Sequence, residues 1–76
     1  MENGTNKRPL DVLGSSLEKN ILVKTKFGDD ITGVLKAFDS HINIWMDDAR
    51  MQGEKEVSLG KVLIRGDNIV FISPAK

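Results

Sequence analysis

The sequence predicts a mainly β domain, in which a short amino-terminal helix precedes a five-stranded antiparallel sheet curled into a small open barrel. Five short apolar runs lie between residues 20 and 73, and the first of them, from Asn20, alternates with a period of two, which is the spacing of a half-buried strand. The turns between these runs are polar and short, so consecutive strands are expected to pair antiparallel. Gly33 and Gly60 interrupt two of the runs and predict bends or bulges that curl the sheet.

The amino-terminal end combines a polar tail with one short helix. Residues 1–7 offer nothing to bury, so we expect a disordered tail there and a single domain over residues 8–76. Pro9 suits the first position of a helix, and the leucines and valine that follow it have partial helical spacing. Gly14 should stop this helix after little more than a turn or two.

Five strands are expected after the helix, each ended by turn residues. The first begins at Asn20 and alternates apolar and polar side chains until the turn at residues 27–30. The remaining strands are predicted at residues 31–38, 42–48, 56–64 and 68–73, with polar turns at 39–41 and 50–54 and with Pro74 closing the last strand. A chain of this pattern is an antiparallel meander, whose second and fourth turns share one end of the sheet.

Length and composition favour self-association. A chain of 76 residues buries only about 60% of its unfolded surface, so a monomer is marginally stable. The sequence has no cysteine and one histidine, which excludes disulfides and disfavours a structural metal, so oligomerisation is the remaining remedy. The last strand is apolar on both faces over residues 69–72, and pairing with another subunit would protect this edge.

Charge and hydropathy limit the classes of partner. The 11 basic and 11 acidic residues balance, so no large basic field drives sequence-blind binding to duplex DNA, and any nucleic-acid binding must be local. The amino terminus lacks the apolar core of a signal peptide, and no apolar run approaches the roughly 20 residues of a membrane span. These observations predict a soluble, cytoplasmic protein with no membrane partner.

Two polar turns, at residues 39–43 and 64–68, carry the most informative chemistry. His41 and Arg65 supply two flat groups that can stack on a nucleobase, and Asn43 supplies an amide that can read the edge of the base. Because the two turns are expected at the same end of the sheet, the three side chains can form one pocket. This combination predicts binding of single-stranded RNA.

These turns also carry a resemblance to a known family. Residues 33–44 resemble the first Sm motif, residues 61–72 resemble the second, and residues 8–13 are similar to the amino-terminal helix of archaeal Sm-like (Lsm) proteins. The resemblance implies the Sm fold, a short helix on a strongly bent five-stranded sheet. It also implies a homo-oligomeric ring, usually of seven subunits in archaea, in which the fourth strand pairs with a neighbour's fifth. Uridine-rich single-stranded RNA is then expected to bind at the inner rim of the pore. The resemblance further implies a role in RNA processing or turnover, with protein partners from those processes.

Each predicted site residue has a proposed role. The base is expected between His41 and Arg65, while the Asn43 amide donates to uracil O4 and accepts from N3–H. Asp39 is expected to accept from the Asn43 amide nitrogen and so fix its orientation. Gly66 is expected to let the backbone approach the base, with the Asp67 amide as a further donor. The predicted RNA-binding residues are therefore Asp39, His41, Asn43, Arg65, Gly66 and Asp67.

Trp45 departs from the family pattern, which more often has a smaller apolar residue at this position. It lies two residues beyond Asn43 and therefore on the same strand face. A contact with RNA, a contact with a neighbouring subunit and simple packing all remain open for it.

Less specific interpretations compete with an RNA pocket. Asp39 and Asn43 are common turn residues, and an isolated His41 or Arg65 is most often a solvated side chain. An enzyme is disfavoured because one histidine and no cysteine supply no metal site, and no serine is placed as a nucleophile. We therefore expect no catalytic residue, metal or cofactor. A ring that serves as a scaffold for protein partners is the main alternative, and a small DNA-binding barrel is a third.

Overall fold

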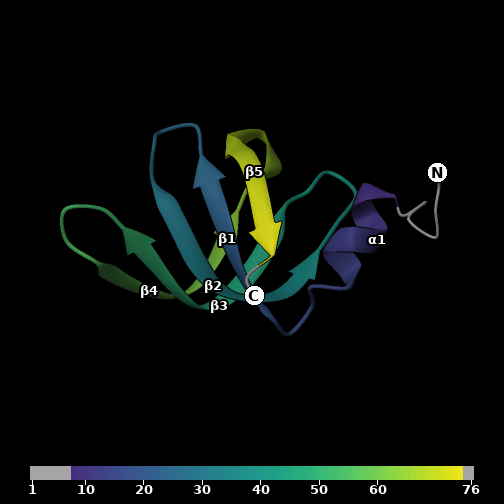
Figure 1. The fold of residues 1–76 in the computed structure, drawn as a ribbon, viewed down its shortest axis with the longest axis horizontal. Coiled ribbons are helices and arrows are strands. Elements are labelled where there is room, and N and C mark those ends of the chain that lie inside the picture. The colour runs from purple at the N-terminus through teal and green to yellow at the C-terminus, as the bar shows by residue number, and fades with distance from the viewer. Residues whose placement is uncertain (1–7, 75–76) are drawn as a thin grey trace.

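A computed structural model of the protein describes residues 8–74, so the tail predicted at residues 1–7 lies outside the described residues. The described chain forms one short helix and five strands, as predicted (Figure 1). In chain order these are α1 (Pro9–Gly14), β1 (Asn20–Thr25), β2 (Asp30–Phe38), β3 (Ile44–Gln52), β4 (Val57–Ile64) and β5 (Ile69–Pro74), with a 3-10 turn at Gly66–Asn68 before β5. No helix within residues 8–74 is long and apolar enough to cross a membrane.

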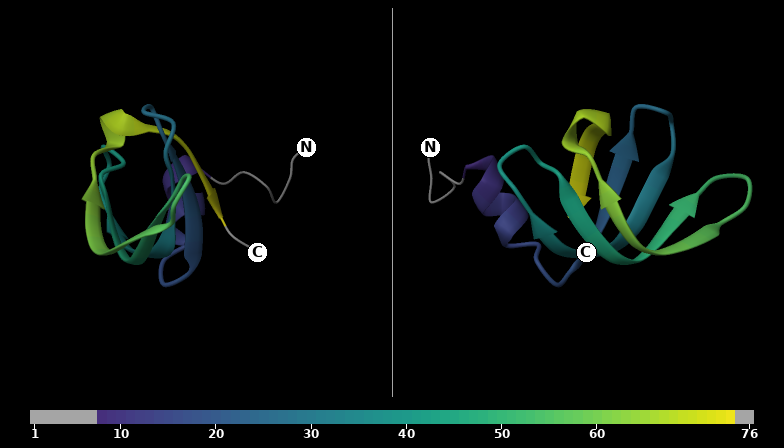
Figure 2. Two further views of the ribbon diagram at one scale, coloured as in Figure 1. Left: turned by 90° about the vertical axis from the view of Figure 1, so that its left-hand side faces the viewer. Right: turned by 180° about the vertical axis from the view of Figure 1, so that it is seen from behind.

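The sheet is antiparallel throughout, and its strand order is β4-β3-β2-β1-β5. The last strand therefore leaves the predicted meander, since β5 pairs with β1 and not with β4. This pairing brings the β1–β2 turn to the 64–68 turn, where the Lys26 N–H donates to the Asn68 carbonyl at 2.8 Å, although a flat meander would separate the two turns. Within the described residues, β4 and β5 are the two edges of an open barrel (Figure 2).

The curl of the sheet comes from irregularities on three neighbouring strands. On β2, a Cβ at Gly33 would lie 2.9 Å from the Asp47 carbonyl oxygen, so β3 approaches closer than a side chain allows. On β3, Asp48 has a φ of 51°, and on β4, Gly60 has a φ of 67°. The strand register shifts at the same places, which confirms the bends predicted at Gly33 and Gly60.

The inner face of the curled sheet forms the core. Alternate residues of β1, β2 and β3 point inward, and α1 contributes one buried leucine at its carboxyl end. This core holds the sheet in the shape that sets the two polar turns beside each other. Its buried apolar residues are Leu13, Ile21, Val23, Ile31, Leu35, Ile44, Met46, Ala49 and Ile64.

The third strand departs most from the prediction. It was expected at residues 42–48, whereas β3 spans Ile44–Gln52. The strand begins later because Ile42 has a φ of 63°, a left-handed conformation that closes the preceding turn. It continues past Asp48 because the left-handed residue there makes a bulge, so residues 50–52 belong to the strand and not to the expected turn. The limits of β2, β4 and β5 match the prediction to within one residue.

Candidate nucleic-acid interface

A pocket of about 500 Å³ lies where the 39–43 and 64–68 turns meet. Its lining comes from both turns, and the sheet brings them together from positions more than 20 residues apart in the chain. Five of the six residues predicted for the site line this pocket, and the carboxylate of the sixth, Asp39, contacts two of them. The lining residues are His41, Asn43, Arg65, Gly66 and Asp67.

The 39–43 turn is closed by hydrogen bonds to Asp39. Its Oδ1 accepts from the backbone N–H of His41 at 2.8 Å and from that of Asn43 at 3.1 Å. The Asp39 backbone N–H donates to the Asn43 carbonyl, and its carbonyl accepts from the Ile42 N–H. The left-handed φ of Ile42 is unfavourable for a β-branched residue, so this network also holds the turn in a strained conformation.

The Asn43 amide is fixed at both of its polar atoms. Its Nδ2 donates to Asp39 Oδ2 at 3.1 Å, and its Oδ1 accepts from the Gly66 backbone N–H at 2.8 Å. Rotation of the amide by 180° would set oxygen against the carboxylate and nitrogen against the N–H. One Nδ2 hydrogen and one Oδ1 lone pair are left over from these two bonds, since an amide has two of each.

The same contacts act on the ionisation of Asp39. The hydrogen bond from the Asn43 side chain lowers the pKa of the Asp39 carboxyl below its ordinary value, and the backbone N–H groups of His41 and Asn43 lower it further. Desolvation opposes this shift without reversing it. Asp39 is therefore a carboxylate at neutral pH and can only accept hydrogen bonds from the amide.

Gly66 is required by the contact between the two turns. A Cβ at this position would collide with the His41 carbonyl oxygen and lie 3.0 Å from the Ile42 carbonyl carbon. From the sequence, we expected glycine at this position to let the backbone approach a bound base. In the structure, the backbone of the 39–43 turn already leaves no room for a side chain at position 66. Only a residue without a side chain lets the Gly66 N–H reach Asn43.

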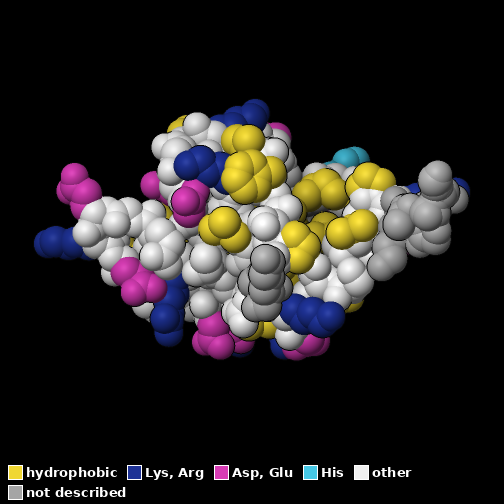
Figure 3. All heavy atoms as spheres, in the orientation of Figure 1, with side chains coloured by type: hydrophobic (Ala, Val, Ile, Leu, Met, Phe, Trp, Pro, Cys, Tyr) yellow, Lys and Arg dark blue, Asp and Glu magenta, His cyan; other side chains and the backbone are white. Residues whose placement is uncertain are grey.

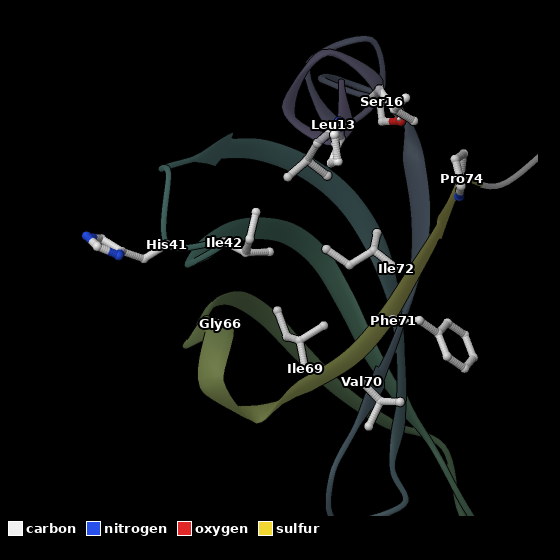
Figure 4. A pocket seen from close by; sticks show the side chains of 12 residues that line it. Leu13, Ser16, His41, Ile42, Gly66, Ile69, Val70, Phe71, Ile72 and Pro74 are labelled. Atoms are coloured by element: carbon white, nitrogen blue, oxygen red, sulfur yellow. Dashed lines mark hydrogen bonds between the residues drawn. The ribbon is translucent and has the colours of Figure 1, made fainter. Parts of the chain in front are cut away.

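The two flat groups of the pocket are exposed. The Arg65 side chain is 75% exposed, and its guanidinium lies 3.6 Å from the Asp67 carboxylate. The His41 ring extends away from the apolar side chains of the neighbouring groove, toward solvent (Figure 4). The site thus combines one immobilised amide with two solvent-facing planar groups.

The family is decided by the match of residues 11–74 to the family model described as the LSM domain. The chain belongs to the LSM domain family. Over 72 residues it is 44% identical to proteins named as snRNP Sm-like proteins from Thermococcus sibiricus and from Pyrococcus horikoshii. These alignments cover 92% of this chain and 95% and 96% of the two relatives.

Solved structures give the same result for the fold of this LSM domain. The Sm protein of Pyrococcus abyssii, determined in complex with a uridine heptamer, superposes with a TM-score of 0.85 at 45% identity, covering 91% of this chain and 100% of that one. The SmAP1 heptamer of P. aerophilum superposes with a TM-score of 0.83 at 35% identity, covering 86% of this chain and 89% of that one. The predicted resemblance to archaeal Sm-like proteins and the predicted fold class are confirmed.

The sequence did not predict the apolar groove of about 490 Å³ beside the pocket between the two turns of this LSM domain. It lies between α1 and β5, with Leu13, Ile42, Ile69 and Ile72 pointing into it and His41 at its rim (Figure 4). Hydrophobic side chains gather over the same region of the surface (Figure 3). The groove depends on β5 crossing to β1, a pairing that a meander does not contain. The apolar character of β5 on both faces was the available signal.

Proposed function

We propose that this chain binds single-stranded uridine-rich RNA in the pocket between the 39–43 and 64–68 turns, at the inner rim of a homo-oligomeric ring. One observation carries the proposal, the immobilised Asn43 amide between Asp39 and Gly66. A freely rotating amide fits uracil and cytosine equally, whereas a fixed one presents a single pattern of donor and acceptor.

The remaining donor and acceptor of Asn43 match uracil. The second Nδ2 hydrogen donates to uracil O4, and the second lone pair of Oδ1 accepts from N3–H. Cytosine has an amino group and an unprotonated N3 at these positions, so it opposes donor to donor and acceptor to acceptor. The Asp39 carboxylate enforces this preference because it accepts hydrogen bonds and cannot donate one at neutral pH.

Stacking supplies affinity with little selectivity. The His41 imidazole and the Arg65 guanidinium enclose the base, at about 1–3 kcal/mol per stacked base. The nearby Asp67 carboxylate, 3.6 Å from the guanidinium, limits the positions that Arg65 occupies. The Asp67 backbone N–H is a further donor toward the base in this proposal.

The ring follows from the two edges of the sheet. In the described part of the chain, β4 and β5 each present an outer row of backbone N–H and C=O groups, so the β4 of one copy can pair with the β5 of the next. Such head-to-tail pairing closes into a ring, and seven subunits are proposed because matching structures are heptamers. Several pockets around one pore engage a strand together, so weak single sites give tight binding.

The proposed role is non-catalytic. Residues 8–74 contain no group of three side chains suited to a metal, and the pocket offers an amide and two stacking groups rather than a nucleophile with its base. We assign the ring to ribonucleoproteins of RNA processing or turnover in the cytoplasm, with protein partners from the same processes.

Fluorescence anisotropy of labelled oligouridine, oligocytidine and oligoadenine tests the function. The wild type should bind oligouridine preferentially. Asn43→Ala should lose at least about 10-fold in affinity for oligouridine, because it removes the amide that hydrogen-bonds to the edge of the base. Light scattering must give the same oligomer for both proteins. A wild-type ring that binds none of the three RNAs would instead support the protein scaffold, and equal affinity for oligodeoxyuridine would support the DNA-binding barrel.

A further inference from the structure

A tryptophan lies exposed on the outer face of the sheet, next to the base pocket. Trp45 on β3 stands opposite Ala37 on β2 and Leu63 on β4. Its neighbours along β3, Ile44 and Met46, are fully buried, whereas Trp45 is 41% exposed and Leu63 is 61% exposed. The largest side chain of the strand therefore packs outside the core.

This exposed aromatic group is continuous with the pocket. Asn43 lies directly before β3 and Arg65 directly after β4, next to the paired residues Ile44 and Ile64. Trp45 and Leu63 form the next pair inside the strands, two positions from Asn43 and Arg65, which is the spacing of side chains that share a face. The step from Asn43 to Trp45 is about 7 Å along the strand, at roughly 3.4 Å per residue. The indole is therefore close enough to the pocket for the nucleotide next to the bound one to present its base to it.

The proposed function leaves RNA beyond the ring of pockets without a contact. One strand fills each pocket with one base, and a longer RNA continues past the last pocket in both directions. Its bases carry the same apolar faces as the base in the pocket. An exposed indole on the adjoining sheet face is the side chain suited to hold such bases, whatever their identity.

We propose that Trp45 is a second stacking surface, which holds bases of the RNA that flank the run bound in the pockets. This inference rests on the proposed function and extends it from a uridine run to the RNA on either side. Because every base has an aromatic face, the flank is held without base preference, while selectivity for uracil stays with Asn43.

The chain carries its own probe for this contact. Trp45 is the single tryptophan, and the sequence contains no tyrosine, so intrinsic fluorescence reports on this one indole. The RNA series consists of a uridine run with one nucleotide per subunit, the same run with added adenosines at either end, and the run with abasic nucleotides in place of the adenosines. The abasic RNA keeps the added phosphates and removes the added bases.

The adenosine flank should quench Trp45 more than the uridine run or the abasic flank does. It should also tighten binding to the wild type by about 5- to 100-fold over the abasic flank, as expected for stacked bases. Trp45→Phe should keep most of this increment, and Trp45→Leu should lose it while binding the bare uridine run as the wild type does. Phe27→Ala, which removes an exposed aromatic side chain outside the pocket lining, should change neither quantity.

Several results would overturn the inference while leaving the proposed function intact. Equal affinity for the adenosine and abasic flanks, or a full increment in Trp45→Leu, would exclude stacking on the indole. A Trp45→Leu protein that falls apart in light scattering, while Trp45→Phe keeps its ring, would assign Trp45 to the subunit interface. The proposed function itself fails only if the wild type does not bind the bare uridine run, and the same titrations measure that affinity separately.

Discussion

The two ends of β3 lead into polar turns of similar composition, yet only one of them makes a site. At the beginning of β3, the Asn43 side chain bonds to Gly66, 23 positions away in another turn. At the other end, Glu56 accepts from Gln52 at 3.2 Å and lies 3.7 Å from Arg50 within one hairpin, and Gln52 also donates to Thr32 on the adjacent strand β2 at 3.5 Å. A polar side chain that links two turns fixes a pocket between them, whereas the contacts at the far end join one hairpin to its adjacent strand and reach no second turn.

The largest expected effect comes from filling the space between the linked turns. Gly66→Ala places a methyl group against the His41 carbonyl oxygen, so the turns must separate and the bond to Asn43 is lost. We expect a loss of about 2 kcal/mol or more in the free energy of unfolding, together with loss of oligouridine binding. Chemical denaturation and anisotropy measure both.

Gly53→Ala is the matched control at the opposite end of β3. The nearest atom to its new methyl group is 3.9 Å away, so the change should stay within about 0.5 kcal/mol. If the two alanine variants unfold at the same denaturant concentration, the difference drawn between the two ends of β3 is wrong.

A smaller effect should follow from Asp39→Asn, which keeps the shape of the side chain and removes its charge. The Asn43 amide then has a partner that can donate as well as accept, so it can rotate to suit cytosine. The ratio of oligouridine affinity to oligocytidine affinity should fall by up to about 10-fold, while the contribution of stacking to both affinities is kept. Competition binding gives the ratio directly.

Glu56→Gln makes the equivalent change in the far hairpin. It should leave the ratio of oligouridine to oligocytidine affinity unchanged, because the contacts of Glu56 stay within that turn. An equal loss of affinity for both RNAs in Asp39→Asn would count against orientation of the amide by the carboxylate.

The smallest effect is a dependence on pH that is confined to acid. The pKa of Asp39 is lowered in the folded protein, so its carboxylate contributes stability that is present above the unfolded pKa of about 3.9 and lost as the pH falls through the folded value. The difference in unfolding free energy between the wild type and Asp39→Asn should be constant from pH 7 to about pH 4 and shrink below it. Denaturation curves across this range would contradict the assignment if the difference changed near neutral pH.

The sequence predicted what depends on local spacing. Asp39 and Asn43 are four residues apart in one turn, and their predicted side-chain bond is present. The predicted meeting of the 39–43 and 64–68 turns is also present, since it requires only that their ends of the sheet coincide. What these residues do to RNA stays a prediction.

Features that depend on long-range packing were missed. The pairing of β5 with β1 results from the curl of the whole sheet, which no single segment encodes. The late start of β3 results from a left-handed isoleucine, a conformation that the preferences of isoleucine alone would exclude. The collision that requires glycine at position 66 exists only after both turns are in place.

The bends at Gly33, Asp48 and Gly60 have a consequence beyond the single chain. They lie on β2, β3 and β4, and so they set the direction in which β4 points relative to β5. In a ring built from β4–β5 contacts, the orientation of β4 relative to β5 sets the rotation angle between neighbouring subunits. The number of subunits in the closed ring is 360° divided by that angle. Three backbone irregularities inside one small sheet would thus determine the number of subunits in the ring and the diameter of the pore that RNA must enter.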